Sequence, residues 1–263
     1  MPVNLNSAFA KLERAAEHTN AIEQLIIAWK DRNPYRLVPE HNHNATRISI
    51  RIRIDKAPDV TLWSLIFSDA IHNYRCVLDH LIYGIATSIH DPVPARIARN
   101  AGFPICDTAD NFTGQRHRIS FAPQRVRDTI EQLQPYNRWT HPEAPPVLSM
   151  LRDLNDIDKH RLLRMALAQV TEGTFSNMRV NVARVEPYSL VSNSRDLVDG
   201  AEIVSLTFSR PQLDLHYDFE AVIQIVMNHP PALGKAGRSE VVGLLKAIDA
   251  EVRDVVAVVR NSI

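Results

Sequence analysis

The sequence predicts an α+β protein in which a helical bundle carries a small antiparallel β-sheet. Apolar residues recur at helical spacing in long segments at both ends and in the middle of the chain. Segments that alternate apolar and polar residues lie between them, which is the pattern of half-buried strands. Because no internal repeat interrupts this order, we expect a single domain over residues 1–263.

Four regions are predicted to supply the helical core. Proline ends the first two helices, at Pro34 and Pro92, because it disfavours a helical conformation in the residue before it. The third region contains a short helix and a second one that starts near Pro145 and runs to about 166. Ser239 is the expected N-cap of the last helix. The four regions are about 6–32, 60–90, 124–166 and 238–260.

The predicted sheet begins with residues 45–55, which alternate between isoleucine and mostly arginine. Three arginines, Arg47, Arg51 and Arg53, give this strand a basic outer face that could hold RNA backbone phosphates. Residues 177–226 contain further segments typical of antiparallel strands. We expect residues 91–123 to be a loop, because prolines interrupt them.

Composition narrows the function classes. The 263 residues include 30 basic and 30 acidic side chains, which argues against a broad electrostatic grip on nucleic acid or membrane but allows a local patch. Two cysteines cannot build a disulfide framework or a zinc knuckle. The first residues do not resemble a secretory signal, and no apolar run is long enough for a membrane span. We therefore expect a cytoplasmic protein with no membrane partner.

The long central helix carries a row of polar side chains within a sector of roughly 120°, at about 100° per residue. Arg75 lies at the edge of this sector, four residues before an aspartate. Acid, imidazole and thiol groups favour ligation or proton transfer over helix formation. Leu65 and Tyr83 continue the sector at both ends, so we expect the row to be enclosed. Its members are Asp69, His72, Asn73, Cys76, Asp79 and His80.

A second polar group is expected on the helix that ends near 166. Asn155, Asp158 and Lys159 fall on its apolar side, where ionisable groups are costly unless they are paired. We expect Asp158 to hold Arg75 or to orient His72 or His80, and Lys159 to pair with Asp69 or Asp79. His160 points elsewhere on the helix and is a supporting candidate. The alternative is a buried ion-pair network that fixes the register of the helices.

These residues carry a resemblance to known proteins. The motifs DxxHNxRxxxDH, from Asp69 to His80, and DKHR, from Asp158 to Arg161, resemble a widespread group of uncharacterised bacterial proteins, over about residues 60–165. Arg75 and His80 also match the R-x4-6-H motif of the HEPN superfamily. That resemblance implies a HEPN-like helical bundle, in which many members are metal-independent ribonuclease toxins or phage-defence effectors. It also implies RNA, a homodimer and a cognate antitoxin as partners.

The first functional hypothesis is therefore a HEPN-like endoribonuclease. Arg75 would stabilise charge on the phosphate, and His80 would act as general acid or base. Asp79 or Asp158 would orient them, with His72 and Lys159 as further catalytic candidates. Arg75 and His80 lie about 140° apart on the helical wheel, so one helix does not easily bring them together. A site shared between two protomers would relieve this problem.

Two alternatives remain open. Asp69, His72, Cys76 and His80 lie on one helical face, where a divalent transition metal such as zinc could be the cofactor of a hydrolase. The other alternative is a non-catalytic binding module, without a cofactor, whose polar cluster fixes the fold. Whichever function holds, we expect Asp69, Asn73, Asn155 and His160 to be supporting residues of the site.

Overall fold

The chain has an α+β fold, as predicted, and forms two compact units. The helical unit comprises residues 1–24, 61–164 and 227–263, and the sheet unit comprises residues 25–60 and 165–226. The prediction of one domain over 1–263 stays a prediction. The computed structural model describes residues 3–138, 145–159, 163, 165–169, 179–180, 189–192, 197–208, 210–211, 217–218, 223–232 and 235–263.

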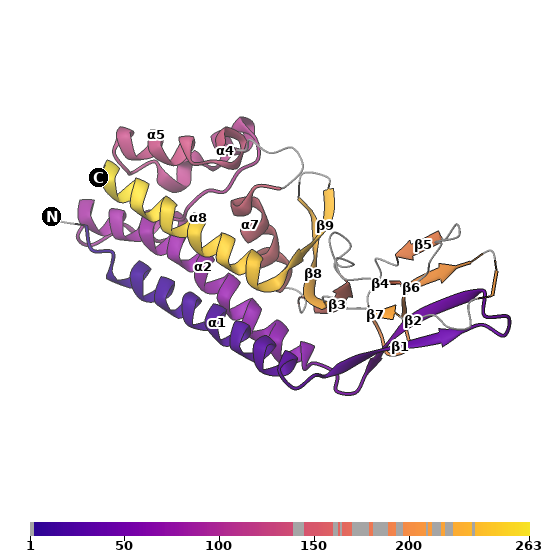
Figure 1. Cartoon of the computed structure of the whole chain (residues 1–263). Coiled ribbons are helices and arrows are strands. Elements are labelled where there is room, and N and C mark those ends of the chain that lie inside the picture. The colour runs from indigo at the N-terminus through magenta and orange to yellow at the C-terminus, as the bar shows by residue number, and fades with distance from the viewer. Residues whose placement is uncertain are drawn as a thin grey trace. The chain divides into compact units, whose positions relative to one another are not determined.

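Helices form in all four regions that were predicted to contain them. The long helices α1, α2 and α8 run side by side (Figure 1). The helices are α1 (Asn6–Lys30), α2 (Val60–Ile89), α3 (Ala95–Asn100), α4 (Ala109–Gln115), the 3-10 helix η1 (Arg116–Ile119), α5 (Gln124–Gln132), α6 (Pro135–Arg138), α7 (Val147–Asp158) and α8 (Val241–Ser262). Each of the described helices is too short or too polar to cross a bilayer.

The prediction that residues 91–123 form a loop is wrong, because this stretch holds α3, α4 and η1. Some of its prolines and polar residues are N-cap residues, which begin helices instead of interrupting them. Pro94 is the N-cap residue of α3. At α4, the Thr108 hydroxyl accepts a hydrogen bond from the backbone N–H of Asn111. Residues 103–106, between the two helices, are buried.

The three long helices share a buried core in the helical unit. Tyr74 of α2 is fully buried, and its hydroxyl lies 3.0 Å from the Thr19 hydroxyl of α1 and 3.1 Å from the Asp249 carboxylate of α8. This hydrogen-bonded group therefore links all three helices. Buried residues of α1 in the helical unit recur at spacings of three and four, as in a coiled-coil seam: Ala8, Leu12, Ala15, Thr19 and Ile22.

Two helix ends differ from the predictions. Helix α7 ends at Asp158 and not near 166, and Met165–Gln169 form a strand, β3. Strand formation depends on pairing with distant residues, which the local spacing of apolar residues does not reveal. Helix α8 is capped by Glu240 and not by Ser239, since the Glu240 carboxylate accepts hydrogen bonds from the first backbone N–H groups of the helix.

The sheet unit contains a four-stranded antiparallel sheet with the order β1-β2-β6-β5. These strands are β1 (Tyr35–His41), β2 (Arg47–Ile54), β6 (Glu202–Thr207) and β5 (Ser189–Ser192). The predicted strand at 45–55 is confirmed as β2. Strand β1 was not predicted, and it is an edge strand, where Pro39 is tolerated because its missing N–H has no partner to lose.

The remaining strands are short or only partly described. Strand β4 (Arg179–Val180) pairs with β7 (Tyr217–Asp218), and β8 (Ile223–Ala232) neighbours β9 (Lys235–Glu240). Antiparallel strands within 177–226 were predicted, and the described pairs β4–β7 and β5–β6 are antiparallel. Much of the predicted stretch 177–226 lies outside the described residues.

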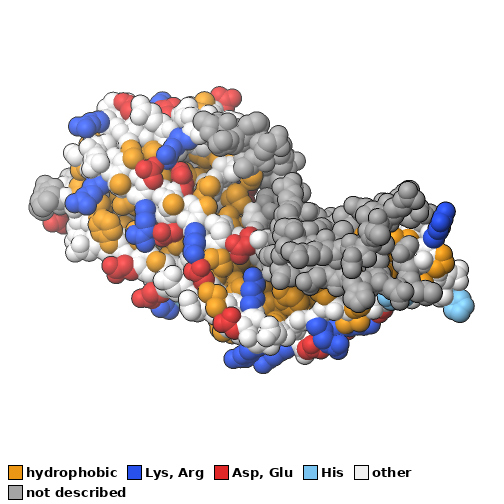
Figure 2. Space-filling model, in the orientation of Figure 1, with side chains coloured by type: hydrophobic (Ala, Val, Ile, Leu, Met, Phe, Trp, Pro, Cys, Tyr) orange, Lys and Arg blue, Asp and Glu red, His pale blue; other side chains and the backbone are white. Residues whose placement is uncertain are grey.

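The basic face of β2 is neutralised by carboxylates. Arg47 Nη2 lies 2.9 Å from Glu202 Oε1, and Arg51 Nε lies 2.8 Å from Glu40 Oε2. Arg53 Nη2 lies 3.2 Å from Glu40 Oε1. These ion pairs leave little net charge for the phosphate contacts that the strand was expected to make. On the face of the molecule drawn in Figure 2, basic and acidic side chains are likewise interspersed over the helices.

Candidate functional site

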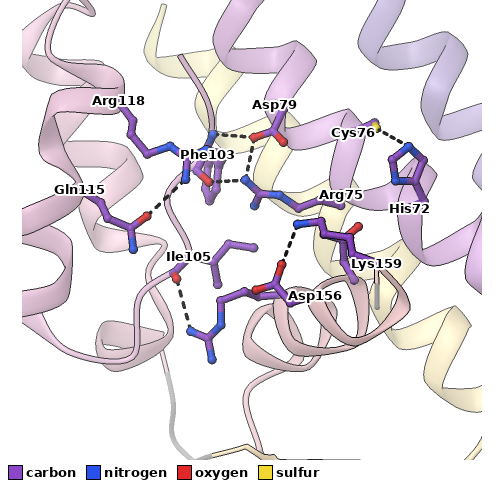
Figure 3. Close-up of a pocket in the computed structure, with 12 residues that line it drawn as sticks. His72, Arg75, Cys76, Asp79, Phe103, Ile105, Gln115, Arg118, Asp156 and Lys159 are labelled. Atoms are coloured by element: carbon purple, nitrogen blue, oxygen red, sulfur yellow. Dashed lines mark hydrogen bonds and ion pairs between the residues drawn. The ribbon is translucent and has the colours of Figure 1, made fainter. Parts of the chain in front are cut away.

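A polar pocket lies in the helical unit beside α2. It has a volume of about 370 Å³. Four parts of the chain surround it: helix α2, the segment after α3 that contains Phe103 and Ile105, the 3-10 helix η1, and helix α7. Cations and carboxylates from these elements face it together (Figure 3). Its lining residues are His72, Arg75, Cys76, Asp79, Phe103, Ile105, Gln115, Arg118, Arg152, Asn155, Asp156 and Lys159.

Arg75 and Asp79 hold the backbone of Phe103 at one wall of the pocket. Arg75 Nη2 donates to Asp79 Oδ1 at 2.7 Å and to the Phe103 carbonyl oxygen at 2.7 Å. Asp79 Oδ1 also accepts a hydrogen bond from the Phe103 backbone N–H at 2.9 Å. We call these three residues the clamp. It satisfies both backbone polar groups of a fully buried residue, which would otherwise be costly.

Further side chains fix the segment that follows Phe103. The backbone N–H of Cys106 donates to the buried Gln134 side chain at 2.9 Å. Arg152 Nη2 lies 2.8 Å from Asp107 Oδ2. Immediately before Phe103, a Cβ on Gly102 would lie 2.5 Å from Arg118 Nη2 and 3.0 Å from Asp79 Oδ1. Only glycine therefore lets Arg118 and Asp79 approach the chain this closely.

Two guanidinium groups face the pocket with hydrogen-bond donors to spare. Both hydrogens of Arg75 Nη2 are used in the clamp, whereas Nη1 and Nε of Arg75 have no hydrogen-bond partner among the described residues. Burial lowers the pKa of Arg75 and the charge of Arg118 acts in the same direction, while Asp79 and Asp156 oppose the shift. Arg118 makes one long hydrogen bond, of 3.4 Å, to Gln115 Oε1.

The polar side chains of α7 do not make the predicted pairs. Lys159 Nζ lies 2.8 Å from Asp156 Oδ1, and not beside Asp69 or Asp79. Asp158 does not line the pocket, and Arg75 forms its ion pair with Asp79 instead. The reason is that partners three or four residues apart on one helix lie within reach without any tertiary constraint. Asn155 is buried and lines the pocket as expected, and His160 lies outside the described residues.

Of the predicted row on α2, His72 and Cys76 reach the pocket in addition to the clamp residues. The Cys76 sulfur lies 3.4 Å from His72 Nε2. Burial raises the pKa of the Cys76 thiol, and nearby Asp79 adds to this while Lys11 and Arg75 oppose it. His72 is exposed, so the row offers one solvent-accessible imidazole at the pocket rim.

The other members of the row point away from the pocket. His80 is half-buried and Asp69 is exposed, and neither lines the pocket. Asn73 is buried and accepts a hydrogen bond from Lys11 Nζ at 3.1 Å. The pocket therefore brings Arg75 together with His72 and not with His80. This agrees with the wide angle between Arg75 and His80 on the helical wheel.

The prediction that apolar residues enclose the row is wrong. The exposed fractions of Leu65 and Tyr83 are 51% and 42%. Single exposed apolar side chains are common on protein surfaces, so an apolar sector does not imply a covering element.

The predicted metal ligands are not gathered into a site. Among the described residues, no group of three or more His, Cys, Asp or Glu side chains is placed to hold a metal ion. Asp69 and His80 stand eleven residues apart on one straight helix, which separates them by about 16 Å along its axis. The set Asp69, His72, Cys76 and His80 therefore cannot converge on one ion within a single chain.

Sequence reasoning missed several lining residues. Arg118 lies in the stretch that was predicted to be a loop, and no spacing rule places it near α2. Arg152 and Asp156 stand four residues apart on α7, the spacing of one helical face, and this signal could have identified them.

Comparisons of the chain with protein-family models, with curated proteins and with solved structures gave no match.

Proposed function

We propose that the protein binds RNA by taking a backbone phosphate into the α2 pocket. The observation that carries this proposal is that Arg75 and Arg118 line the same pocket with unused N–H donors. Like charges repel, so two guanidiniums that share a partly buried pocket favour an anion between them. Arg118 has no ion pair with any described residue, and it is therefore the group most in need of one.

A phosphate suits these donors in shape and charge. The guanidinium presents a planar fork of N–H groups that matches two phosphate oxygens, and the Lys159 ammonium adds a compact charge at the rim. The side chain of Lys159 is 57% exposed, so it can turn from Asp156 to a ligand at small cost. Because four basic and two acidic side chains line this pocket, local phosphate binding is compatible with zero net charge of the whole chain.

RNA is the proposed source of the phosphate because Arg75 and His80 match the R-x4-6-H motif of HEPN proteins, many of which act on RNA. In that family the site lies between two protomers, and a homodimer with a cognate antitoxin would fit the same reading. The pocket of one chain already holds Arg75 and His72, so phosphate binding does not require the second copy.

Binding of a fluorescently labelled eight-nucleotide RNA, followed by anisotropy, tests this proposal. Lys159→Gln and Arg118→Gln should each weaken binding about threefold to tenfold, because each removes one charge-assisted phosphate contact. Arg116→Gln is the matched control, since Arg116 belongs to the same 3-10 helix and does not line the pocket. Equal losses in Arg116→Gln and Arg118→Gln would contradict a specific phosphate site.

A second candidate function is metal-independent RNA cleavage, which the presence of His72 in the pocket favours. His72 would accept the proton of a ribose 2′-hydroxyl, whose oxygen then attacks the adjacent phosphorus. The bond from phosphorus to the 5′-oxygen breaks, and the Lys159 ammonium would supply the proton for that oxygen. Arg75 and Arg118 would stabilise the charge on the phosphorane. The products are a 2′,3′-cyclic phosphate and a 5′-hydroxyl.

Cleavage is tested with purified protein and total RNA in the presence of EDTA. We expect 2′,3′-cyclic phosphate ends from the wild-type protein, and at least a hundredfold slower cleavage by His72→Gln, since general acid–base catalysis contributes about that much. His80→Gln is the control and should cleave normally. Loss of cleavage in His80→Gln alone would instead favour a site shared between protomers. Intact RNA with the wild-type protein would leave RNA binding as the function.

A further inference from the structure

A second pocket of about 360 Å³ lies on the far side of Arg118, lined by η1 and α3. It carries cationic and neutral polar groups, and no carboxylate is among its lining residues. Arg118 lines both this pocket and the α2 pocket. The other lining residues that matter here are Arg96, His117, Asn100, Ser120 and Phe121.

We propose that this pocket is a second subsite for the same ligand, and that a single RNA strand passes from the α2 pocket across Arg118 into it. The inference rests on the proposed function, and it adds the strandedness and minimum length of the ligand. One shared guanidinium between two pockets can contact two successive phosphates, because its fork presents N–H groups on two edges.

The donors of the second pocket are available for a ligand. Arg96 is exposed and makes no ion pair with any described residue. His117 Nδ1 lies 3.0 Å from the Gly114 carbonyl oxygen, and since a carbonyl only accepts, Nδ1 carries the proton. This hydrogen bond orients the ring and leaves Nε2 for a ligand, as an acceptor when the ring is neutral and as a donor when it is protonated.

The pocket also contains an aromatic surface suited to an unpaired base. Phe121 is half-buried and lines the pocket beside the cations. Bases of single strands stack on aromatic side chains, and each such contact is worth about 1–3 kcal/mol. A base inside a duplex is stacked on its neighbours and cannot enter a pocket of this kind. The combination of cations and a ring therefore favours a single strand.

The test compares a one-nucleotide probe with a longer one. Uridine 3′-monophosphate fills only the α2 pocket, whereas a labelled octauridylate reaches both. We expect Arg96→Gln and His117→Gln each to weaken octauridylate binding about threefold to tenfold and to leave the monophosphate within twofold of wild type. In Arg96→Gln, which removes one cationic phosphate contact, the salt dependence of octauridylate binding should also fall by about 0.7 in logarithmic slope. Arg99→Gln, on the same helix as Arg96 but outside the pocket, is the matched control.

The outcomes separate this inference from the proposed function. If Arg96→Gln and His117→Gln bind octauridylate as tightly as Arg99→Gln does, the second subsite is refuted while phosphate binding in the α2 pocket stands. If the wild-type protein binds neither probe, the proposed function fails and the subsite fails with it. Far-ultraviolet circular dichroism of each variant verifies that the fold is retained. Arg96 and His117 are exposed, so their replacement should leave it unchanged.

Discussion

Two aspartates line the α2 pocket, and because only Asp79 belongs to the clamp, its replacement by alanine should lower the free energy of unfolding much more than the same change at Asp156. In Asp79→Ala, the buried Phe103 N–H loses its acceptor, which costs about 1–3 kcal/mol. Arg75 loses its counter-charge as well, and breaking a fully buried pair costs about 3–5 kcal/mol. Both losses are partly offset. The Asp79 side chain is 35% exposed, so water can reach the groups left without Asp79, and the Phe103 carbonyl oxygen still accepts a hydrogen bond from Arg75. We expect a net loss of about 2–4 kcal/mol.

Urea unfolding of the purified variants measures this loss. Asp156→Ala is the control, because Asp156 pairs with Lys159 at the surface, with exposed fractions of 59% and 57%, and such pairs are worth about 0–1 kcal/mol. Asp79→Asn keeps an oxygen that accepts from Phe103 and should lose about half as much as Asp79→Ala. If Asp79→Ala and Asp156→Ala unfold within 0.5 kcal/mol of each other, about the scatter expected of surface substitutions, the clamp does not stabilise the fold.

Further predictions concern α8 and α2. Glu240→Ala should cost about 0.5–2 kcal/mol in urea unfolding because it removes the N-cap of α8, whereas Ser239→Ala should cost nearly nothing. Burial raises the pKa of Tyr74, so above pH 10 the unfolded chain releases a proton that the folded chain keeps, and stability falls; Tyr74→Phe should show a shallower fall. Burial also raises the pKa of Cys76, so iodoacetamide should alkylate it more slowly at pH 8 than it alkylates a free thiol. Gly84→Ala should lower the unfolding free energy by about 1–3 kcal/mol, since its Cβ would lie 2.7 Å from a backbone oxygen that cannot easily move.

The spacing of apolar residues was sufficient to predict the helices and strands in which that spacing repeats along the whole element. Helix α2 and strand β2 were predicted within a few residues, because apolar residues recur at helical or strand spacing along the whole length of each element. The prediction failed where pairing with distant residues decides the structure, as for β3. It also failed in 91–123, where α3 has six residues and α4 has seven, which is too few turns for a periodic signal.

For the candidate site, the sequence identified which face of α2 is polar but not which residues of that face line the pocket. His72 and His80 both fall within the predicted sector, yet only His72 lines the pocket. Which histidine lines the pocket depends on where α7 and η1 pack against α2. The sequence of α2 alone does not determine that packing. Arg118 was missed for the same reason.

The structural and functional interpretations of Arg75 are compatible. Its Nη2 is held on two sides by the clamp, which removes the rotational freedom that a free arginine would lose on binding. The orientation fixed in this way leaves the N–H groups of Nη1 and Nε unpaired among the described residues, and each of them can donate a hydrogen bond to a phosphate oxygen. Asp79 is then a positioning residue for the phosphate ligand. If so, Asp79→Asn should weaken RNA binding more than its modest loss of stability alone would explain, whereas a purely structural clamp would leave the affinity of the folded protein unchanged.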